Sequence, residues 1–113
     1  MPRHFLGEFE KAVLLALIRL GDNAYGVTIR EELTTRLARH VAIGAVYTTL
    51  GRLEEKGFVS STLGNPTPER GGRAKRFFRL EAGGAEALRS SLAAHDALTD
   101  YIRTPLLPSL ERL

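Results

Sequence analysis

The residues with the most evident chemistry in this sequence are five basic side chains that lie close together between positions 70 and 80. They are Arg70, Arg73, Lys75, Arg76 and Arg79, and no acidic residue interrupts them. The chain has 16 Lys+Arg against 13 Asp+Glu, a formal net charge of +3, so this segment supplies all of the surplus. Such a strip, with two glycines at one end and two phenylalanines inside, is typical of a hairpin that meets a polyanion. A solvated surface strand is the alternative.

Catalytic chemistry finds little support in the residue pattern. The three histidines, His4, His40 and His95, are scattered, and no Ser/His/Asp grouping or carboxylate pair has catalytic spacing. The chain has no cysteine, which excludes disulfides and thiolate ligands. Asp96 and Asp100 share a helical face, but no second histidine lies near them, so a metal-sensing regulator remains an alternative with little support. We therefore expect no enzyme, no cofactor and no metal.

Length and composition predict a single small domain. The chain has 113 residues, 43% of them hydrophobic, which is enough for a small core. Its longest apolar run, Ala12–Ile18, is too short to span a membrane, and the N-terminus does not resemble a signal peptide. We expect a cytoplasmic protein, and the sequence pI near 9.7 is compatible with a nucleic-acid partner.

Three helices are predicted before the basic segment. The first, about Gly7–Leu20, is apolar nearly all round, so it is either a central core helix or a helix shared with a partner subunit. The second is predicted over about Tyr25–Arg39. The third runs over about Ala45–Lys56, and Gly57 supplies its left-handed stop. Within the third helix we expect Gly51 to allow close packing of another backbone.

The third helix has a small, mostly uncharged face opposite its apolar stripe, and this face is the candidate DNA-reading surface. Its outward residues are predicted to be Ala45, Thr48, Thr49 and Arg52. Thr methyl groups can contact thymine, and an Arg can bond guanine or a phosphate. Tyr47 either packs in the core or donates to DNA, and a packed ring with an outward hydroxyl would combine the two roles.

A hairpin and a last helix complete the predicted fold. The strands are Phe58–Leu63 and Ala74–Leu80, with Phe78 and Leu80 directed to the core. The last helix is predicted from about Ala82 to Arg103, ended by Pro105 and Pro108.

An apolar stripe on the last helix predicts a homodimer, because a domain of this size offers little to cover it. The first helix is expected to help. The residues predicted at the dimer interface are Leu14, Ile18, Leu88, Leu92, His95, Leu98 and Ile102.

Three helices followed by a basic hairpin predict a winged helix-turn-helix, a mainly α fold with a small β-hairpin. We expect residues 1–80 to bind DNA and residues 81–113 to form a dimerisation helix and tail, in one compact unit. The hairpin is then the wing. Its expected DNA contacts are Arg70, Gly71, Gly72, Arg73 and Lys75.

The amino-acid sequences of these elements resemble those of the PadR family of bacterial transcriptional regulators over about residues 10–92. Tyr25-Gly26 resembles the family's helix-two start, and Val46-Tyr-Thr-Thr-Leu-Gly-Arg-Leu-Glu-Glu-Lys-Gly-Phe-Val59 resembles its recognition-helix signature. Arg73-Ala-Lys-Arg-Phe-Phe-Arg-Leu80, followed by Ala82-Gly83, resembles its second wing strand and last-helix entry. Two positions depart from the family, since Thr48 replaces a common Pro and Glu81 replaces a capping Thr.

With this resemblance, we expect a transcriptional regulator, a repressor, that binds double-stranded DNA as a homodimer. Because a two-fold dimer presents two reading helices, its site should be an inverted repeat. The short region after the wing resembles the subgroup with a single C-terminal dimerisation helix. The family also implies a small-molecule effector between dimer helices, where Phe5, Phe9, His95 and Tyr101 either line a ligand space or pack together. A winged-helix protein-docking module that does not bind DNA is the alternative function.

Overall fold

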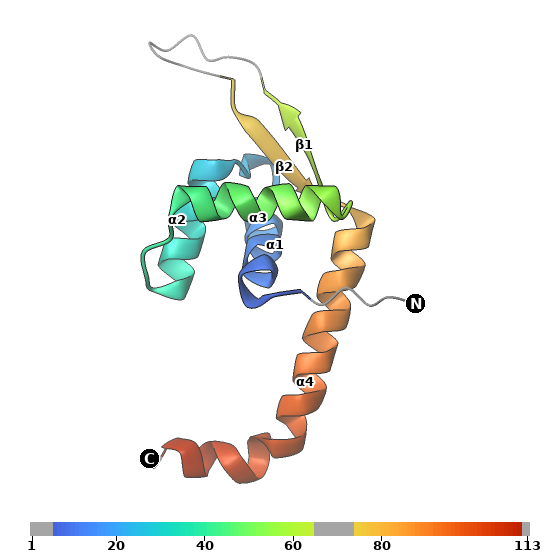
Figure 1. Cartoon of the computed structure of the whole chain (residues 1–113). Coiled ribbons are helices and arrows are strands. Elements are labelled where there is room, and N and C mark those ends of the chain that lie inside the picture. The colour runs from blue at the N-terminus through green and yellow to red at the C-terminus, as the bar shows by residue number, and fades with distance from the viewer. Residues whose placement is uncertain (1–5, 65–73, 112–113) are drawn as a thin grey trace.

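The computed structural model describes residues 6–64 and 74–111, with side chains through residue 100. Figure 1 shows the first helices and the hairpin gathered into one body, with a long last helix leaving it. The winged helix-turn-helix fold predicted from the sequence is confirmed. The elements are α1 (Glu8–Leu20), a 3-10 turn η1 (Gly21–Asn23), α2 (Gly26–Leu37), α3 (Ile43–Glu55), β1 (Val59–Leu63), β2 (Arg76–Leu80) and α4 (Ala82–Glu111).

Helix α1 lies at the centre of the core. It contacts α2, α3, β2 and α4, and its Val13 and Leu14 are completely buried. The structure confirms that α1 is a core helix, and its expected share in a dimer interface stays a prediction. The expectation that Leu14 lies at a dimer interface is wrong, because elements of the same chain already cover it. One side of α1 nevertheless stays open, since Leu15 is 39% and Ile18 56% exposed.

The hairpin is fixed to the body along one edge. Strands β1 and β2 pair antiparallel with Ser61 opposite Phe78. The other edge of β2 meets the segment before α2, where the Phe78 N–H donates to the Ala24 carbonyl at 2.8 Å and Tyr25 forms an isolated bridge with Phe77. Phe78 is buried and Leu80 packs against the core, as predicted. This pairing fixes where the wing leaves the domain.

Helix α3 stops before Gly57 as the sequence predicts, whereas Gly51 inside the helix does not have the role that we expected. Gly57 has φ 77°, a left-handed conformation that glycine adopts without strain. Gly51 is exposed, and a Cβ built there meets nothing within 4 Å. The expected close packing at Gly51 is therefore wrong, because this side of α3 faces open space.

Close packing occurs instead where α4 begins. A Cβ at Gly84 would collide with the Phe58 carbonyl oxygen and lie 2.8 Å from Cδ1 of Leu80. The Glu81 N–H also donates to the Phe58 carbonyl, at 2.9 Å. The first turn of α4 thus lies directly on the start of β1, and only glycine fits at position 84.

The C-terminal end of α4 differs from the prediction. The helix continues to Glu111, so Pro105 and Pro108 lie inside it and do not end it. Proline lacks the N–H that a helix interior uses, so a helix that contains it commonly bends. In Figure 1 the last part of α4, coloured red, runs at a steep angle to the rest. None of the described helices is long and apolar enough to cross a membrane.

Candidate nucleic-acid interface

The outer face of α3 is small and carries no carboxylate over its first turns. Gly44, Ala45, Thr48 and Arg52 are all exposed, and together with Gly51 they form a surface on which Arg52 is the one long side chain. Acidic residues follow only at the C-terminal end of the helix. Because no bulky or anionic group intervenes, a negatively charged backbone can approach this face closely.

Thr49 lies on the opposite face from the one predicted. Its side chain is only 6% exposed. Thr49 is three residues after Val46 and four before Leu53, both of which are completely buried, so helical periodicity places all three on the inner face. The prediction that Thr49 faces outward is therefore wrong. The same periodicity, counted from Val46 in the sequence, carried this information.

Tyr47 packs across the start of α2. A Cβ built at Gly26 would collide with the hydroxyl end of the Tyr47 side chain, so the ring covers this glycine closely. Half of the Tyr47 side chain, 50%, remains exposed. The ring is packed as expected, but the hydroxyl lies over Gly26 and does not project away from the helices. Gly26 and Tyr47, which lie in separate segments of the sequence, form one contact.

The structure describes only part of the basic segment between residues 70 and 80. Arg70, Gly71, Gly72 and Arg73 lie outside the described residues. Lys75 places its ammonium 4.6 Å from the centre of the Tyr25 ring, and that ring meets Phe77 edge-on with 5.4 Å between centroids. This cation–π contact holds Lys75 at the junction of the wing and α2 while leaving it exposed.

Arg76 and Arg79 point to different neighbours. Arg76 Nη1 donates to Ser61 Oγ at 3.1 Å, and Ser61 Oγ donates to Oε2 of Glu54 at 2.8 Å. Arg79 instead borders a groove between α1 and the hairpin, and its side chain makes no ion pair or hydrogen bond within the described residues. The three described cations of this segment, which look equivalent in the sequence, therefore have different environments.

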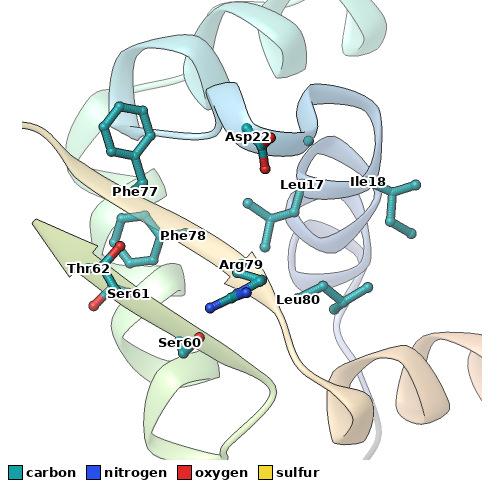
Figure 2. Close-up of a pocket in the computed structure, with 11 residues that line it drawn as sticks. Leu17, Ile18, Asp22, Ser60, Ser61, Thr62, Phe77, Phe78, Arg79 and Leu80 are labelled. Carbon is teal, nitrogen blue, oxygen red and sulfur yellow. The ribbon is translucent and has the colours of Figure 1, made fainter. Parts of the chain in front are cut away.

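Figure 2 shows this groove, which has a volume of about 470 Å³. Leu17 and Ile18 of α1 form one wall, and the hairpin residues Arg79 and Leu80 lie across from them. Asp22 also borders the groove. Charges of both signs lie here, so this groove offers a polyanion no consistent attraction.

A second cleft, of about 340 Å³, lies between α1, the end of α2 and α4. Its apolar lining includes Phe9, Leu15 and Leu92, with His95 at its border. Leu15 was not among the predicted interface residues, although its place in an all-apolar stretch of α1 was a usable signal.

The predicted interface stripe on α4 is divided by burial. Leu88 is only 4% exposed because its own chain covers it, so its expected place at a dimer interface is wrong. Leu92 and Leu98 are 40% and 71% exposed, and His95 is exposed. The Ile102 side chain, like those of Phe5 and Tyr101, lies outside the described residues.

An ion pair ties the far end of α3 to α1. Lys56 Nζ lies 2.9 Å from Oε2 of Glu10, whose Oε1 accepts the Gly7 N–H at 2.8 Å. Burial raises the pKa of the Glu10 carboxyl, but these two hydrogen bonds and the Lys56 and Arg52 charges outweigh it, so the net pKa lies below its ordinary value. Within the part of the chain that the structure describes, no group of three or more His, Cys, Asp or Glu residues could hold a metal.

Comparisons with known proteins agree with this geometry. Residues 14–90 match the transcriptional regulator PadR-like family. The chain therefore belongs to this family, which consists of transcriptional regulators and not enzymes. No curated protein matches the sequence.

Solved structures share the fold at low sequence identity. A PadR family regulator from Eggerthella lenta is 24% identical, with a TM-score of 0.67 over 88% of this chain and 87% of that one. A PadR family regulator from Clostridium difficile is 21% identical, with a TM-score of 0.69 over 87% and 97%. A PadR-like regulator from Bacillus cereus is 18% identical, with a TM-score of 0.68 over 88% and 91%.

Proposed function

We propose that this protein is a transcriptional repressor that binds double-stranded DNA in a sequence-specific manner as a homodimer. The observation that carries the proposal is the outer face of α3, which is exposed, small and free of carboxylates over its first turns. A helix with such a face, preceded by a second helix and followed by a basic hairpin, suits insertion into a major groove.

We assign DNA reading to Ala45, Thr48 and Arg52, which are exposed on α3, with Tyr47 beside them. Thr49 is removed from this set because it is buried. The wing is proposed to contact phosphates through Arg70, Gly71, Gly72, Arg73 and Lys75. Residues 1–80 would thus form the DNA-binding part and residues 81–113 the dimerisation part, in a protein that acts in the cytoplasm.

Dimerisation is proposed through the open side of α4 with help from α1. Leu92, His95 and Leu98 on α4 and Leu15 and Ile18 on α1 are exposed, and most of them are large apolar side chains. Ile102 continues the same stripe in the sequence. A two-fold dimer presents two reading helices, so the operator should be an inverted repeat with half-sites one or two helical turns apart.

The experiment that tests this function is selection of bound duplexes from a random pool, followed by a salt titration of the affinity. If each subunit neutralises roughly four phosphates, the slope of log K against log salt should be about −7 for the dimer. Arg73→Ala should weaken all sequences alike and flatten the slope by about 2. Thr48→Ala and Arg52→Ala together should remove the preference for the selected operator over random DNA. Retention of that preference would favour the protein-docking alternative.

The cleft beside α4 favours a second role, binding of a small-molecule effector. Its volume of about 340 Å³ and its apolar lining by Phe9, Leu15 and Leu92 are compatible with a small apolar ligand. The test is a titration of the protein with a fluorescent apolar dye. Binding that Leu15→Gln abolishes would support the role, whereas packing of the second subunit into the cleft would leave no dye binding.

A further inference from the structure

A hydrogen-bonded chain of three side chains connects the hairpin to the end of α3. Arg76 of β2 donates to Ser61 of β1 at 3.1 Å, and Ser61 donates to Glu54 of α3 at 2.8 Å. We call this chain the Glu54–Ser61–Arg76 brace. It joins α3 to both strands of the hairpin, β1 and β2, which are the elements proposed to contact DNA.

The strand register explains why these side chains meet. Ser61 pairs with Phe78, and Arg76 pairs with Leu63, so Ser61 and Arg76 are diagonal neighbours on one face of the hairpin. Phe78 on the same face is buried. The brace therefore lies on the face that packs toward the core, next to the point where that packing ends.

Apolar packing does not hold the distal end of the described hairpin on this side. Leu63, the cross-strand partner of Arg76, is 61% exposed. The contact of Phe77 with Tyr25 fixes the opposite edge of the hairpin to the start of α2. These contacts do not fix the distance between the hairpin and the C-terminal end of α3. The brace spans that distance.

The charges at this point also match a structural role. Glu54 lies in the last turn of α3, where a carboxylate is disfavoured by the negative end of the helix dipole. The hydrogen bond that Ser61 donates to Glu54 offsets this unfavourable interaction with the helix dipole. Arg76 supports the arrangement by donating in turn to Ser61. The guanidinium of Arg76 is thereby directed toward the protein, whereas its neighbour Lys75 lies over the Tyr25 ring and forms no ion pair with any residue that the structure describes.

We propose that Arg76 is a positioning residue of the wing and not a phosphate contact. Through Ser61 and Glu54 it sets the angle between the hairpin and α3, so that the wing and the reading helix meet the same duplex together. This inference rests on the proposed DNA-binding function. It adds that the basic residues have different roles, since Arg76 positions the wing whereas Arg70, Arg73 and Lys75 are proposed to contact phosphates.

The sharpest test compares two neighbouring carboxylates of α3. Glu54 belongs to the brace, whereas Glu55 is exposed and its carboxylate makes no hydrogen bond or ion pair within the described residues. Removal of either carboxylate should strengthen DNA binding if charge alone matters. We expect Glu54→Ala to weaken binding to the selected operator about three- to tenfold through loss of the brace, and Glu55→Ala to leave it unchanged or tighter. Tighter binding by Glu54→Ala would overturn the inference.

Salt dependence separates the two roles of Arg76. A positioning residue leaves the number of released counterions unchanged, so Arg76→Ala should lower the affinity with the same log–log slope as wild type. Loss of one phosphate contact per subunit would flatten that slope by about 2 per dimer and overturn the inference. Ser61→Ala should reproduce the loss of affinity, and Ser61→Thr, which keeps the hydroxyl, should restore it.

Hydrogen exchange of the free protein keeps the test independent of DNA. We expect faster exchange of the β1 and β2 amides in Glu54→Ala, Ser61→Ala and Arg76→Ala than in wild type or Glu55→Ala. Equal exchange in all five proteins would overturn the brace itself. Absence of any DNA binding by wild type, with the exchange differences intact, would instead overturn the proposed function and the role of the brace in it.

Discussion

Helices α3 and α4 both present a face that no other part of the described chain covers, and the two faces differ in chemistry. The open face of α3 consists of glycine, alanine, threonine and arginine, with the ring of Tyr47 at its side. The open face of α4 carries Leu92 and Leu98, the latter 71% exposed. One surface suits a hydrated, charged partner, and the other suits an apolar one.

This difference teaches that exposure alone does not define a binding surface. Large apolar groups left in water favour association with another apolar surface, whereas small polar groups lose little by staying hydrated. The contrast therefore supports the proposals that α3 contacts DNA and that α4 contacts a second subunit. Each assignment can be broken separately, since the two faces lie on different elements.

The largest effect is expected from a charge on the α4 face. Leu98→Glu would place an unpaired carboxylate in the proposed interface, so the dimer should weaken at least a hundredfold and the protein should elute as a monomer. Light scattering after size-exclusion chromatography measures this. Ala93→Glu, which adds the same charge on the opposite side of α4, is the control and should remain dimeric. A wild-type protein that is monomeric at tens of micromolar would contradict the assignment.

The joint between α4 and the body should be the next most sensitive point. Gly84→Ala forces a methyl group against the Phe58 carbonyl and Leu80, so the free energy of unfolding should fall by about 1–3 kcal/mol. Gly83→Ala is the matched control, because a Cβ there meets its neighbours at an ordinary 3.7 Å. Urea denaturation compares them. Equal stability of the two variants would show that α4 is not seated on the hairpin as described.

A smaller effect of opposite sign is expected on the α3 face. Gly51→Ala adds a methyl group in open space within a helix, so stability should rise by about 0.5–1 kcal/mol. Operator affinity should fall, since the methyl group occupies the surface that we assign to DNA. Thermal unfolding and a binding titration measure the two changes. Gly57→Ala, at φ 77°, should instead lower stability, and unaltered DNA binding by Gly51→Ala would place the duplex elsewhere.

The smallest effect concerns the ion pair that holds α3 to α1. The pKa of Glu10 is lowered in the folded protein, so its contribution to stability is complete above its unfolded value and is lost as pH falls through the folded one. Stability should therefore decline below about pH 4.5, and Glu10→Gln should make this decline shallower. Glu31→Gln, at an exposed position of α2 without an ion pair in the described chain, should keep the wild-type profile. Urea denaturation between pH 3 and 7 measures the free energy of unfolding of wild type and both variants, and so compares their pH profiles.

Much of the fold was predictable because periodicity and glycine positions are local signals. The three helices, the hairpin with Phe78 inward and the stop at Gly57 all follow from spacing along the chain. The prolines of α4 were misjudged for the same reason. A local rule ends the helix before Pro105, whereas the structure continues it to Glu111 with a bend.

The candidate site was only partly predictable, because side-chain environments depend on neighbours distant in sequence. Arg76 and Lys75 are adjacent in the chain, yet one bonds Ser61 and the other lies over Tyr25. Strand alternation separates their directions, but the identity of each partner comes from the packing of α2 and α3 against the hairpin.

The sequence by itself determined the winged-helix order, the family and the basic character of the wing, since these depend on local pattern and composition. Only the tertiary structure decided which apolar residues remain exposed after folding. Leu14 and Leu98 have the same side chain, but the first is completely buried among the neighbours of α1 and the second is 71% exposed on α4. Burial is a property of the packed chain, so it separates core from interface where hydrophobicity alone does not.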